Sequence, residues 1–136
     1  IYDVRRTIET RIVTLAAIRR TEAEATAILD QAREMRRVCA EPDRLMEADL
    51  AFHQALARAS RNPVFELIVG AFQGITRQTW PMGWKSRTTA EARETMIATH
   101  EEIARAVAEG DPVAANAAMA IHFDESVRAL LSAGMA

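Results

Sequence analysis

Four side chains of the kinds that bind divalent metal ions lie in segments of this sequence with a helical pattern: Asp49, His53, His100 and His122. In a helix, Asp49 and His53 are four residues apart and therefore lie on one face, a turn apart. A carboxylate and an imidazole at that spacing can supply two ligands to one divalent cation. The chain has three histidines, and all of them fall inside helical patterns. We therefore predict one metal site made by these four side chains.

His100 and His122 would meet only if their helices pack side by side. A turn is predicted at 110–111, with His100 ten residues before its first residue and His122 eleven residues after its second. The two imidazoles would then be level across a helical hairpin. Taken singly, a histidine on an apolar face is more often a core residue bonded to a carbonyl, and Asp49 with His53 could be a local ion pair. The combination of the four residues favours a shared metal.

The ligand types restrict which metal such a site would hold. Three imidazoles and one carboxylate suit zinc, nickel, iron, cobalt or manganese, and zinc is the first choice by ligand type and availability. An ion with a larger coordination shell would keep positions open. A small carboxylate ligand could fill them, with a nearby arginine countering its charge.

Hydrophobic residues recur with the period of amphipathic helices along almost the whole chain. The pattern predicts helices over about 2–19, 21–38, 43–60, 64–79, 88–110 and 112–133, with an irregular stretch over 80–87 that holds both tryptophans. Capping boxes are expected at Thr21 with Glu24 and at Thr88 with Glu91. No segment alternates like a strand. The predicted fold class is all-α, an antiparallel bundle of about six helices.

Composition and charge exclude several classes of protein. The 136 residues are 49% hydrophobic and 26% charged, as expected for one globular domain with a real core. A net charge of −2 gives this segment no electrostatic footprint for nucleic acid. No apolar run approaches the ~20 residues that cross a bilayer, and the single cysteine, Cys39, fits a reducing cytoplasm. The chain starts inside a helical pattern without methionine, so we expect a longer protein with a missing N-terminal part.

The arrangement of these motifs resembles the FadR C-terminal (FCD) ligand-sensing domain of the GntR superfamily of bacterial transcription regulators. The resemblance covers nearly the whole chain and rests on the metal-ligand pattern together with the segments Arg5–Glu9, Asp49–Leu56, Ala59–Pro63, His100–Val107 and Gly110–Ala115. Six helices rather than seven is similar to the VanR-like branch.

That resemblance implies properties that the residues alone do not give. It implies that residues 1–136 form an effector-binding and dimerisation domain, whose Asp and three His hold a divalent metal. It also implies a small organic acid or sugar acid effector, a homodimer, and an N-terminal winged helix-turn-helix domain, absent here, that binds operator DNA in the cytoplasm. No contact with a membrane is expected.

Three further residues are candidates for contacting the effector. Arg5 matches a first-helix arginine of the family that can reach the cavity, and Trp84 falls where some members place a ligand-contacting side chain. Arg77 is a candidate partner for a carboxylate. Each arginine could equally be a surface residue in a weak ion pair, and Trp80 and Trp84 could be dimer contacts.

The predicted function is therefore metal-dependent sensing of a small acid by a transcription regulator, without enzymatic activity. The main alternative is a metal-dependent hydrolase or lyase that uses the same four ligands to activate water. A third interpretation is a purely structural dimerisation bundle, which would hold no stoichiometric ion.

Overall fold

The computed structural model describes residues 1–134 and contains helices in the predicted order. Their bounds are α1 (Tyr2–Arg19), α2 (Glu22–Arg37), α3 (Pro42–Ala59), α4 (Pro63–Ser86), α5 (Ala90–Ala108) and α6 (Pro112–Ser132). Within residues 1–134 there is no strand, so the all-α prediction is confirmed. No helix in this part of the chain combines the length and the apolar character needed to cross a membrane.

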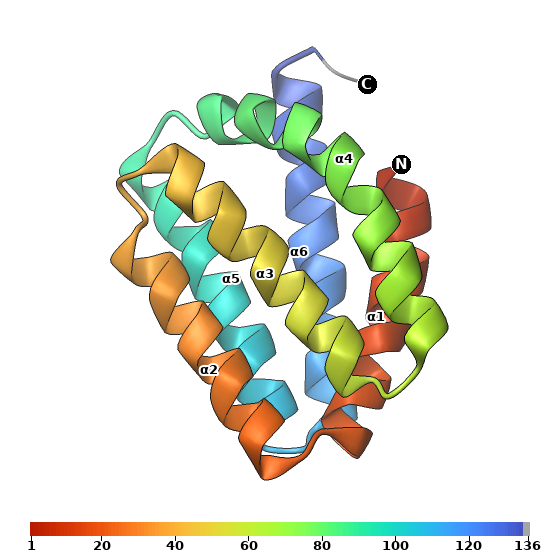
Figure 1. The fold of residues 1–136 in the computed structure, drawn as a ribbon. Helices are drawn as coiled ribbons and strands as arrows, with labels where there is room; N and C mark the ends of the chain where they lie inside the picture. The colour runs from red at the N-terminus through yellow and green to blue at the C-terminus, as the bar shows by residue number, and fades with distance from the viewer. Residues whose placement is uncertain (135–136) are drawn as a thin grey trace.

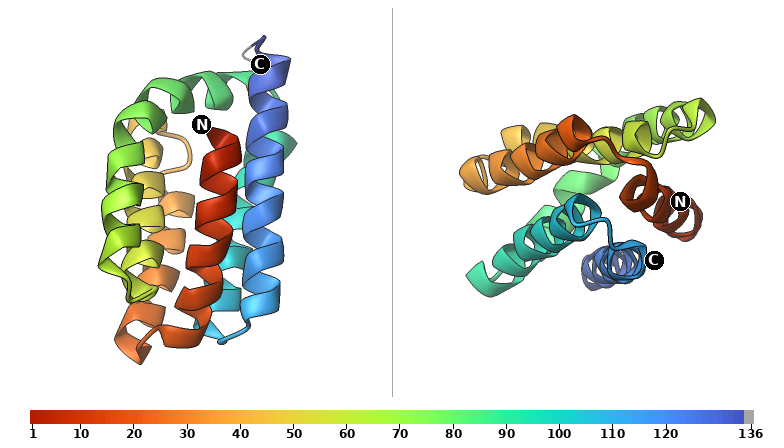
Figure 2. Two further views of the ribbon diagram at one scale, coloured as in Figure 1. Left: turned by 90° about the vertical axis from the view of Figure 1, so that its right-hand side faces the viewer. Right: turned by 90° about the horizontal axis from the view of Figure 1, so that it is seen from below.

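The helices pack in two layers with their axes roughly aligned (Figure 1, Figure 2). In one layer α3 lies between α2 and α4, and in the other α6 lies between α5 and α1. The layers meet through the pairs α2 with α5, α1 with α3, and α4 with α6. Helices α3, α5 and α6, which carry the predicted metal ligands, therefore face one another across the interior.

Local sequence signals set most of the helix ends. Thr21 and Glu24 form the predicted capping box, in which each side chain accepts a hydrogen bond from the other residue's backbone N–H. Asn62 caps α4 by accepting a hydrogen bond from the N–H of Val64. Gly110, with a φ of 71°, makes the turn between α5 and α6. These caps satisfy backbone groups that a helix end otherwise leaves unpaired.

Helix α4 is longer than predicted. The prediction of an irregular stretch over 80–87 is wrong, because the helix continues through Pro81 to Ser86 and bends over one end of the bundle (Figure 1). Proline removes one backbone hydrogen bond and normally breaks a helix. Here Trp80 and Trp84, one turn apart, stack with ring centroids 5.4 Å apart, and their packing keeps the last turns helical.

The start of α5 also differs from its prediction by one residue. The N-cap is Thr89, whose hydroxyl accepts a hydrogen bond from the N–H of Ala92. The capping box expected between Thr88 and Glu91 is therefore wrong. Adjacent threonines offer the same capping chemistry, so the sequence alone does not tell which of the two is the N-cap.

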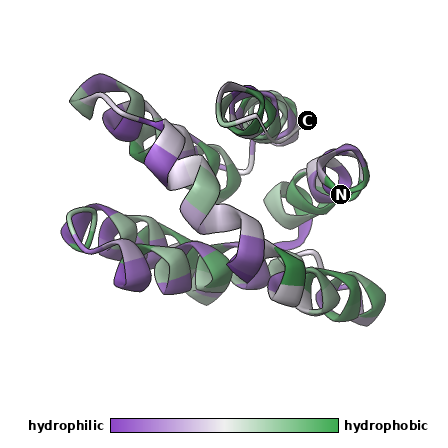
Figure 3. Cartoon of the chain, turned by 90° about the horizontal axis from the view of Figure 1, so that it is seen from above, coloured by the Kyte–Doolittle hydropathy of each residue, from purple (hydrophilic) through white to green (hydrophobic). Residues whose placement is uncertain are grey.

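Hydrophobic and hydrophilic residues lie on different sides of the helices (Figure 3). The apolar sides form one core, to which all six helices contribute residues. Against this apolar interior the buried polar side chains are conspicuous, because such groups need partners. They are Arg5, Glu9, Asp49, His53, Ser60, Thr76, His100 and His122.

Candidate metal and effector site

The four predicted ligands meet in the interior between α3, α5 and α6. One nitrogen from each histidine lies within 4.8 Å of one from each of the other two, and all three rings are buried. The ring centroids of His100 and His122 are 4.5 Å apart, so the two imidazoles are level across the α5–α6 hairpin as predicted. The Oδ1 atom of Asp49 lies 3.2 Å from Nε2 of His53 and 3.0 Å from Nε2 of His100.

Two of the imidazoles are oriented by hydrogen bonds on the side away from this centre. Nδ1 of His100 donates to the carbonyl oxygen of Met96, at 2.7 Å, and Nδ1 of His53 donates to Oε1 of Glu9, at 2.5 Å. A carbonyl oxygen can only accept, so the proton of neutral His100 is on Nδ1 and its Nε2 carries the lone pair. Such a bond on the far nitrogen is the usual support for a metal-binding histidine.

The distances inside the site fit a bound cation. Ligand atoms that share an ion at 2.0–2.2 Å lie roughly 2.8–3.6 Å from one another, depending on the geometry. The two contacts from Oδ1 of Asp49, at 3.0 and 3.2 Å, fall in that range. With the histidine protons on Nδ1, these contacts join atoms that bear lone pairs, so positive charge must lie between them. A proton or a metal ion can supply it, and the donor set of three nitrogens and one oxygen suits a divalent metal.

Helix α1 supplies a supporting ion pair that the sequence analysis did not predict. Glu9 is 1% exposed and joins His53 to Arg5, whose Nε donates to Oε2 at 2.7 Å. Nη1 of Arg5 also donates to the hydroxyl of Thr76, at 3.2 Å. Arg5 and Glu9 are four residues apart, so they pair on one face of the helix. This network fixes the orientation of His53.

Helix α4 supplies the corresponding support for the carboxylate. Nε1 of Trp80 donates to Oδ2 of Asp49, at 2.8 Å. Because this bond occupies Oδ2, the other oxygen, Oδ1, is left to face His53 and His100. The segment predicted to be irregular therefore contributes directly to the site through its helical geometry.

Burial and neighbouring charges shift the pKa values of these groups in different directions. Burial alone would raise the pKa of Asp49, but His100 and His53 hold it well below its usual range. Burial would lower the pKa of His53, but the carboxylates of Glu9 and Asp49 outweigh it and raise that pKa to about 9. Burial and the two neighbouring imidazoles lower the pKa of His122 well below its usual value. The site thus combines an ionised carboxylate with imidazoles of very different basicity.

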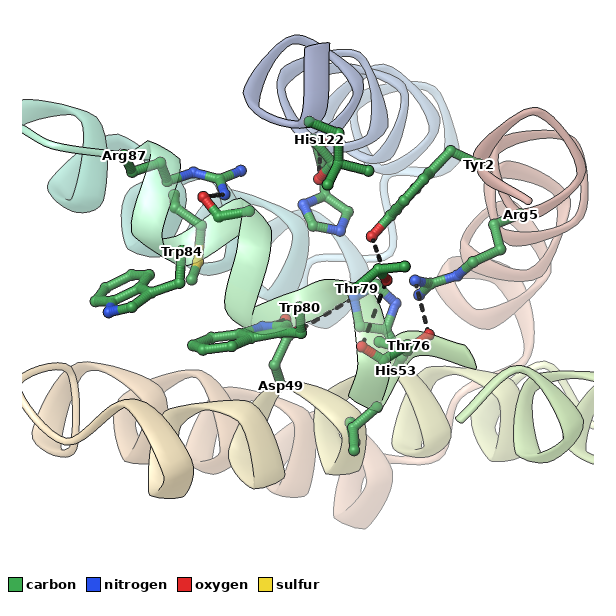
Figure 4. Close-up of a pocket in the computed structure, with 15 residues that line it drawn as sticks. Tyr2, Arg5, Asp49, His53, Thr76, Thr79, Trp80, Trp84, Arg87 and His122 are labelled. Atoms are coloured by element: carbon green, nitrogen blue, oxygen red, sulfur yellow. Dashed lines mark hydrogen bonds and ion pairs between the residues drawn. The ribbon is translucent and has the colours of Figure 1, made fainter. Parts of the chain in front are cut away.

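A small cavity of about 40 Å³ adjoins the ligands, which is room for roughly three water molecules. Figure 4 shows its polar walls: His122 lies across the cavity from Asp49 and His53, with Tyr2 and Arg5 at one end and Trp84 and Arg87 at the other. The predicted effector contacts Arg5 and Trp84 both line this cavity. Trp84 is buried and its Nε1 is the one buried side-chain nitrogen or oxygen without a hydrogen-bond partner in residues 1–134.

The structure does not bring Arg77 to this cavity. Its guanidinium forms an exposed ion pair with Glu47 on the surface between α4 and α3. The helix position explains this placement, since Thr76 and Trp80 occupy the inner face of α4 and Arg77 is about 100° around the helix from Thr76. Arg77 therefore matches the alternative interpretation, a surface residue in an ion pair, and not the predicted effector contact.

Sequence reasoning also missed Thr76, Thr79, Trp80 and Arg87, which line the cavity with the predicted residues. Predicting 80–87 as helical would have identified Trp80 and Arg87. One face of a helix continued through this segment carries residues at intervals of one to four: Thr76, Thr79, Trp80, Gly83 and Arg87.

Comparisons with known proteins agree with the fold. The family model described as the FCD domain matches residues 1–125. The chain is 34% identical over 129 residues to the HTH-type transcriptional regulator LutR of Bacillus subtilis (strain 168), an alignment that covers 90% of this chain and 57% of LutR.

Two solved structures have the same fold. Streptococcus agalactiae GntR superposes with a TM-score of 0.77 at 25% identity, over 93% of this chain and 56% of that one. E. coli McbR/YncC superposes with a TM-score of 0.80 at 15% identity, over 95% of this chain and 65% of that one, and shows the fold alone. The chain thus spans between about half and two thirds of the length of these proteins.

The family bears on the enzyme alternative. The matching family and the similar curated protein belong to transcription regulation, not to metal-dependent hydrolases or lyases. The enzyme alternative is therefore wrong. Since the family model matches 1–125 of 136 residues, the chain belongs to the FCD domain family of GntR-type transcription regulators.

Proposed function

We propose that this domain senses a small organic acid or sugar acid through a divalent metal held by Asp49, His53, His100 and His122. In this proposal the domain acts as a homodimer and controls operator binding by an N-terminal winged helix-turn-helix domain in the cytoplasm. Residues 1–136 would then be the effector-binding and dimerisation part of a longer regulator.

One observation carries the metal part of the proposal. Oδ1 of Asp49 and the Nε2 atoms of His53 and His100 converge at 3.0–3.2 Å, while the outer nitrogen of each ring is held by its own acceptor. Held this way, the inner nitrogens of His53 and His100 point at one place beside Oδ1 of Asp49, where a metal ion would take the position of the proton that otherwise joins these atoms.

When bound, a divalent ion, with zinc as first choice and nickel, iron, cobalt or manganese as alternatives, would supply a Lewis-acidic centre for a carboxylate or hydroxyl oxygen. The protein's own residues hold the site in place. Trp80 fixes which oxygen of Asp49 faces inward, and Glu9 fixes the ring of His53. Arg5 balances the charge of Glu9, and Phe52 packs against the rings of His53 and His100.

The cavity supports an effector that is small and polar. Its volume of about 40 Å³ excludes a long apolar chain, and its walls include hydroxyl, carboxylate, imidazole and guanidinium groups. Among the predicted effector contacts, Trp84 contributes a flat buried wall and Arg5 a cationic one whose main partner is already Glu9. Arg77, in its surface ion pair, is not carried into the proposal.

Helix α4 connects this cavity to the outside of the bundle. Its inner face carries Thr76 and Trp80, and its outer face exposes an apolar row formed by Val64, Leu67 and Ile75, at 59%, 74% and 45% exposure. Exposed apolar rows of this kind usually mark an interface. An antiparallel copy of α4, related by a two-fold axis near residue 71, would place Leu67 against the partner's Ile75, so this row supports the proposed homodimer.

Regulation would then be a shift between two packings of α4. An effector that prefers one position of the inner face also favours one position of the outer face, and so one spacing of the attached DNA-binding domains. Such coupling requires different affinities for the two states, and tight binding alone would not produce it.

Metal analysis of the purified protein tests the proposal. After loading with zinc and dialysis, we expect about one ion per chain, and His100→Gln should lose it while Glu102→Gln, an exposed change on the same helix, should keep it. A wild-type protein that holds no stoichiometric ion would refute the sensing mechanism and favour the structural dimerisation bundle.

A further inference from the structure

One cationic group of the cavity, Arg87, has no anionic partner among residues 1–134. Arg87 stands at the C-terminal end of α4, where it lines the cavity opposite α1, and Figure 4 shows its guanidinium directed toward the side of His122. Its Nη1 donates to the carbonyl oxygen of Gly83, at 3.0 Å. No carboxylate in residues 1–134 forms an ion pair with it. Four of its five N–H groups therefore have no acceptor in the described protein.

This arginine differs from the other arginines near the site. The guanidinium of Arg5 is occupied by Glu9 and Thr76, and that of Arg77 by Glu47 on the surface. Arg87 is partly buried, and burial lowers its pKa even though Asp49 and Glu125 act in the opposite direction. Its guanidinium faces the cavity with no carboxylate paired to it in residues 1–134, so it is available to an anion from outside the chain.

The position of the guanidinium is held by the helix. Residue 83 lies one turn before Arg87, and a Cβ atom on Gly83 would stand 3.3 Å from Nη1. The glycine thus leaves the space in which the guanidinium folds back over the last turn to reach the cavity. Trp84 adds rigidity there, since it stacks on Trp80 and lies 4.5 Å beneath the guanidinium carbon of Arg93.

The charges around the cavity indicate what kind of anion would fit, given the proposed metal. A divalent ion offset by Asp49 leaves one positive charge, the pair of Arg5 with Glu9 is neutral, and Arg87 adds a second positive charge. The imidazoles are neutral when they bind a metal. The loaded cavity therefore carries two positive charges at two separate points of its wall.

We propose that Arg87 is a second anchoring point of the effector site, and that it selects short dicarboxylates by binding one carboxylate while the other faces the metal ligands. The planar fork of arginine matches a carboxylate with two parallel hydrogen bonds. The small volume of the cavity, about 40 Å³, favours the shortest chains between the two carboxylates, and even a four-carbon dicarboxylate would have to widen it. This inference rests on the proposed metal-dependent sensing and adds the class of the effector.

Calorimetric titration of the zinc-loaded protein tests it, with succinate as a dicarboxylate probe and butyrate as a monocarboxylate of the same length. We expect the wild type to bind succinate more tightly than butyrate. Arg87→Gln should weaken succinate binding roughly ten- to hundredfold and remove that preference. Arg87→Lys keeps the charge but not the planar fork, so its affinity for succinate should lie between those of the wild type and Arg87→Gln. Arg77→Gln, on the same helix but outside the cavity, is the matched control and should match the wild type.

The outcomes separate this inference from the proposed function. Zinc content and unfolding temperature, measured on each variant, show whether the site and the fold are intact. If the wild type holds zinc but shows no preference for succinate, or if Arg87→Gln keeps that preference, the role of Arg87 is refuted while metal binding stands. If Arg77→Gln loses the preference equally, the effect is general electrostatics and the inference is also refuted. Absence of zinc from the wild type refutes the proposed function itself.

Discussion

Glu9 offers the sharpest test of how the site is held together. The change Glu9→Gln keeps the size of the side chain and one acceptor oxygen but removes its charge. Glu9 and Arg5 are 1% and 6% exposed, so Arg5 would be left as a buried cation without a counter-ion. His53 would lose the carboxylate that accepts from its Nδ1. Both effects follow from one carboxylate that touches no metal.

The magnitudes can be worked out separately for stability and for metal binding. Removing one partner of a buried ion pair typically costs about 3–5 kcal/mol, and we expect about 3 kcal/mol because glutamine can still accept one hydrogen bond. In a domain of this size that corresponds to a fall in unfolding temperature of roughly 10 °C. Loss of an outer partner of a metal-bound histidine weakens metal binding roughly ten- to hundredfold, or about 1.4–2.8 kcal/mol.

Thermal unfolding of the chelator-treated protein measures the first quantity, and competition with a zinc chelator measures the second. Glu47→Gln is the control, because Glu47 forms an exposed ion pair with Arg77 and should change neither quantity appreciably. A Glu9→Gln protein with wild-type zinc affinity would refute the idea that Glu9 orients His53. Unchanged thermal unfolding would refute the idea that Arg5 depends on it.

Two further predictions concern pH and assembly. In the metal-free protein the pKa of His53 is raised to about 9, against about 6.5 when unfolded, so its contribution to the free energy of unfolding should be complete below about pH 6.5 and disappear as the pH rises through about 9. Urea unfolding at several pH values measures this contribution. His53→Gln should remove it from the pH dependence of the free energy of unfolding. The same pH dependence in the wild type and in His53→Gln would contradict the prediction. Leu67→Glu, at a 74% exposed position, should shift the proposed dimer toward monomer in sedimentation without loss of helix content, whereas Glu102→Gln should not. A Leu67→Glu protein that stays dimeric would show that the outer face of α4 is not the contact.

Much of this fold follows from patterns within each segment of the sequence. The helical period predicted six helices, and local caps such as Thr21 and Asn62 set their starts because a cap depends only on neighbours in the chain. The meeting of Asp49 with the three histidines was predictable for a similar reason. Asp49 and His53 share a face by helix geometry, and the turn at Gly110 makes His100 and His122 level.

Other features depended on contacts between distant segments, and no local pattern contains them. Pro81 argues for a break, yet α4 continues because Trp80 reaches Asp49 across the interior and stacks on Trp84. The spacing of Arg77 gave no sign of whether it would face the cavity or the surface, since that depends on which side of α4 packs on α3.

The sequence by itself therefore determined the helices apart from the last turns of α4, the candidate ligands and their rough level in the bundle. Only the tertiary structure decided that Glu9 supports His53 and that Arg87 lines the cavity without a carboxylate partner in residues 1–134. The physical reason is that helix periodicity acts over a few residues, whereas hydrogen bonds and charge balance in the interior join side chains more than 40 positions apart in the chain.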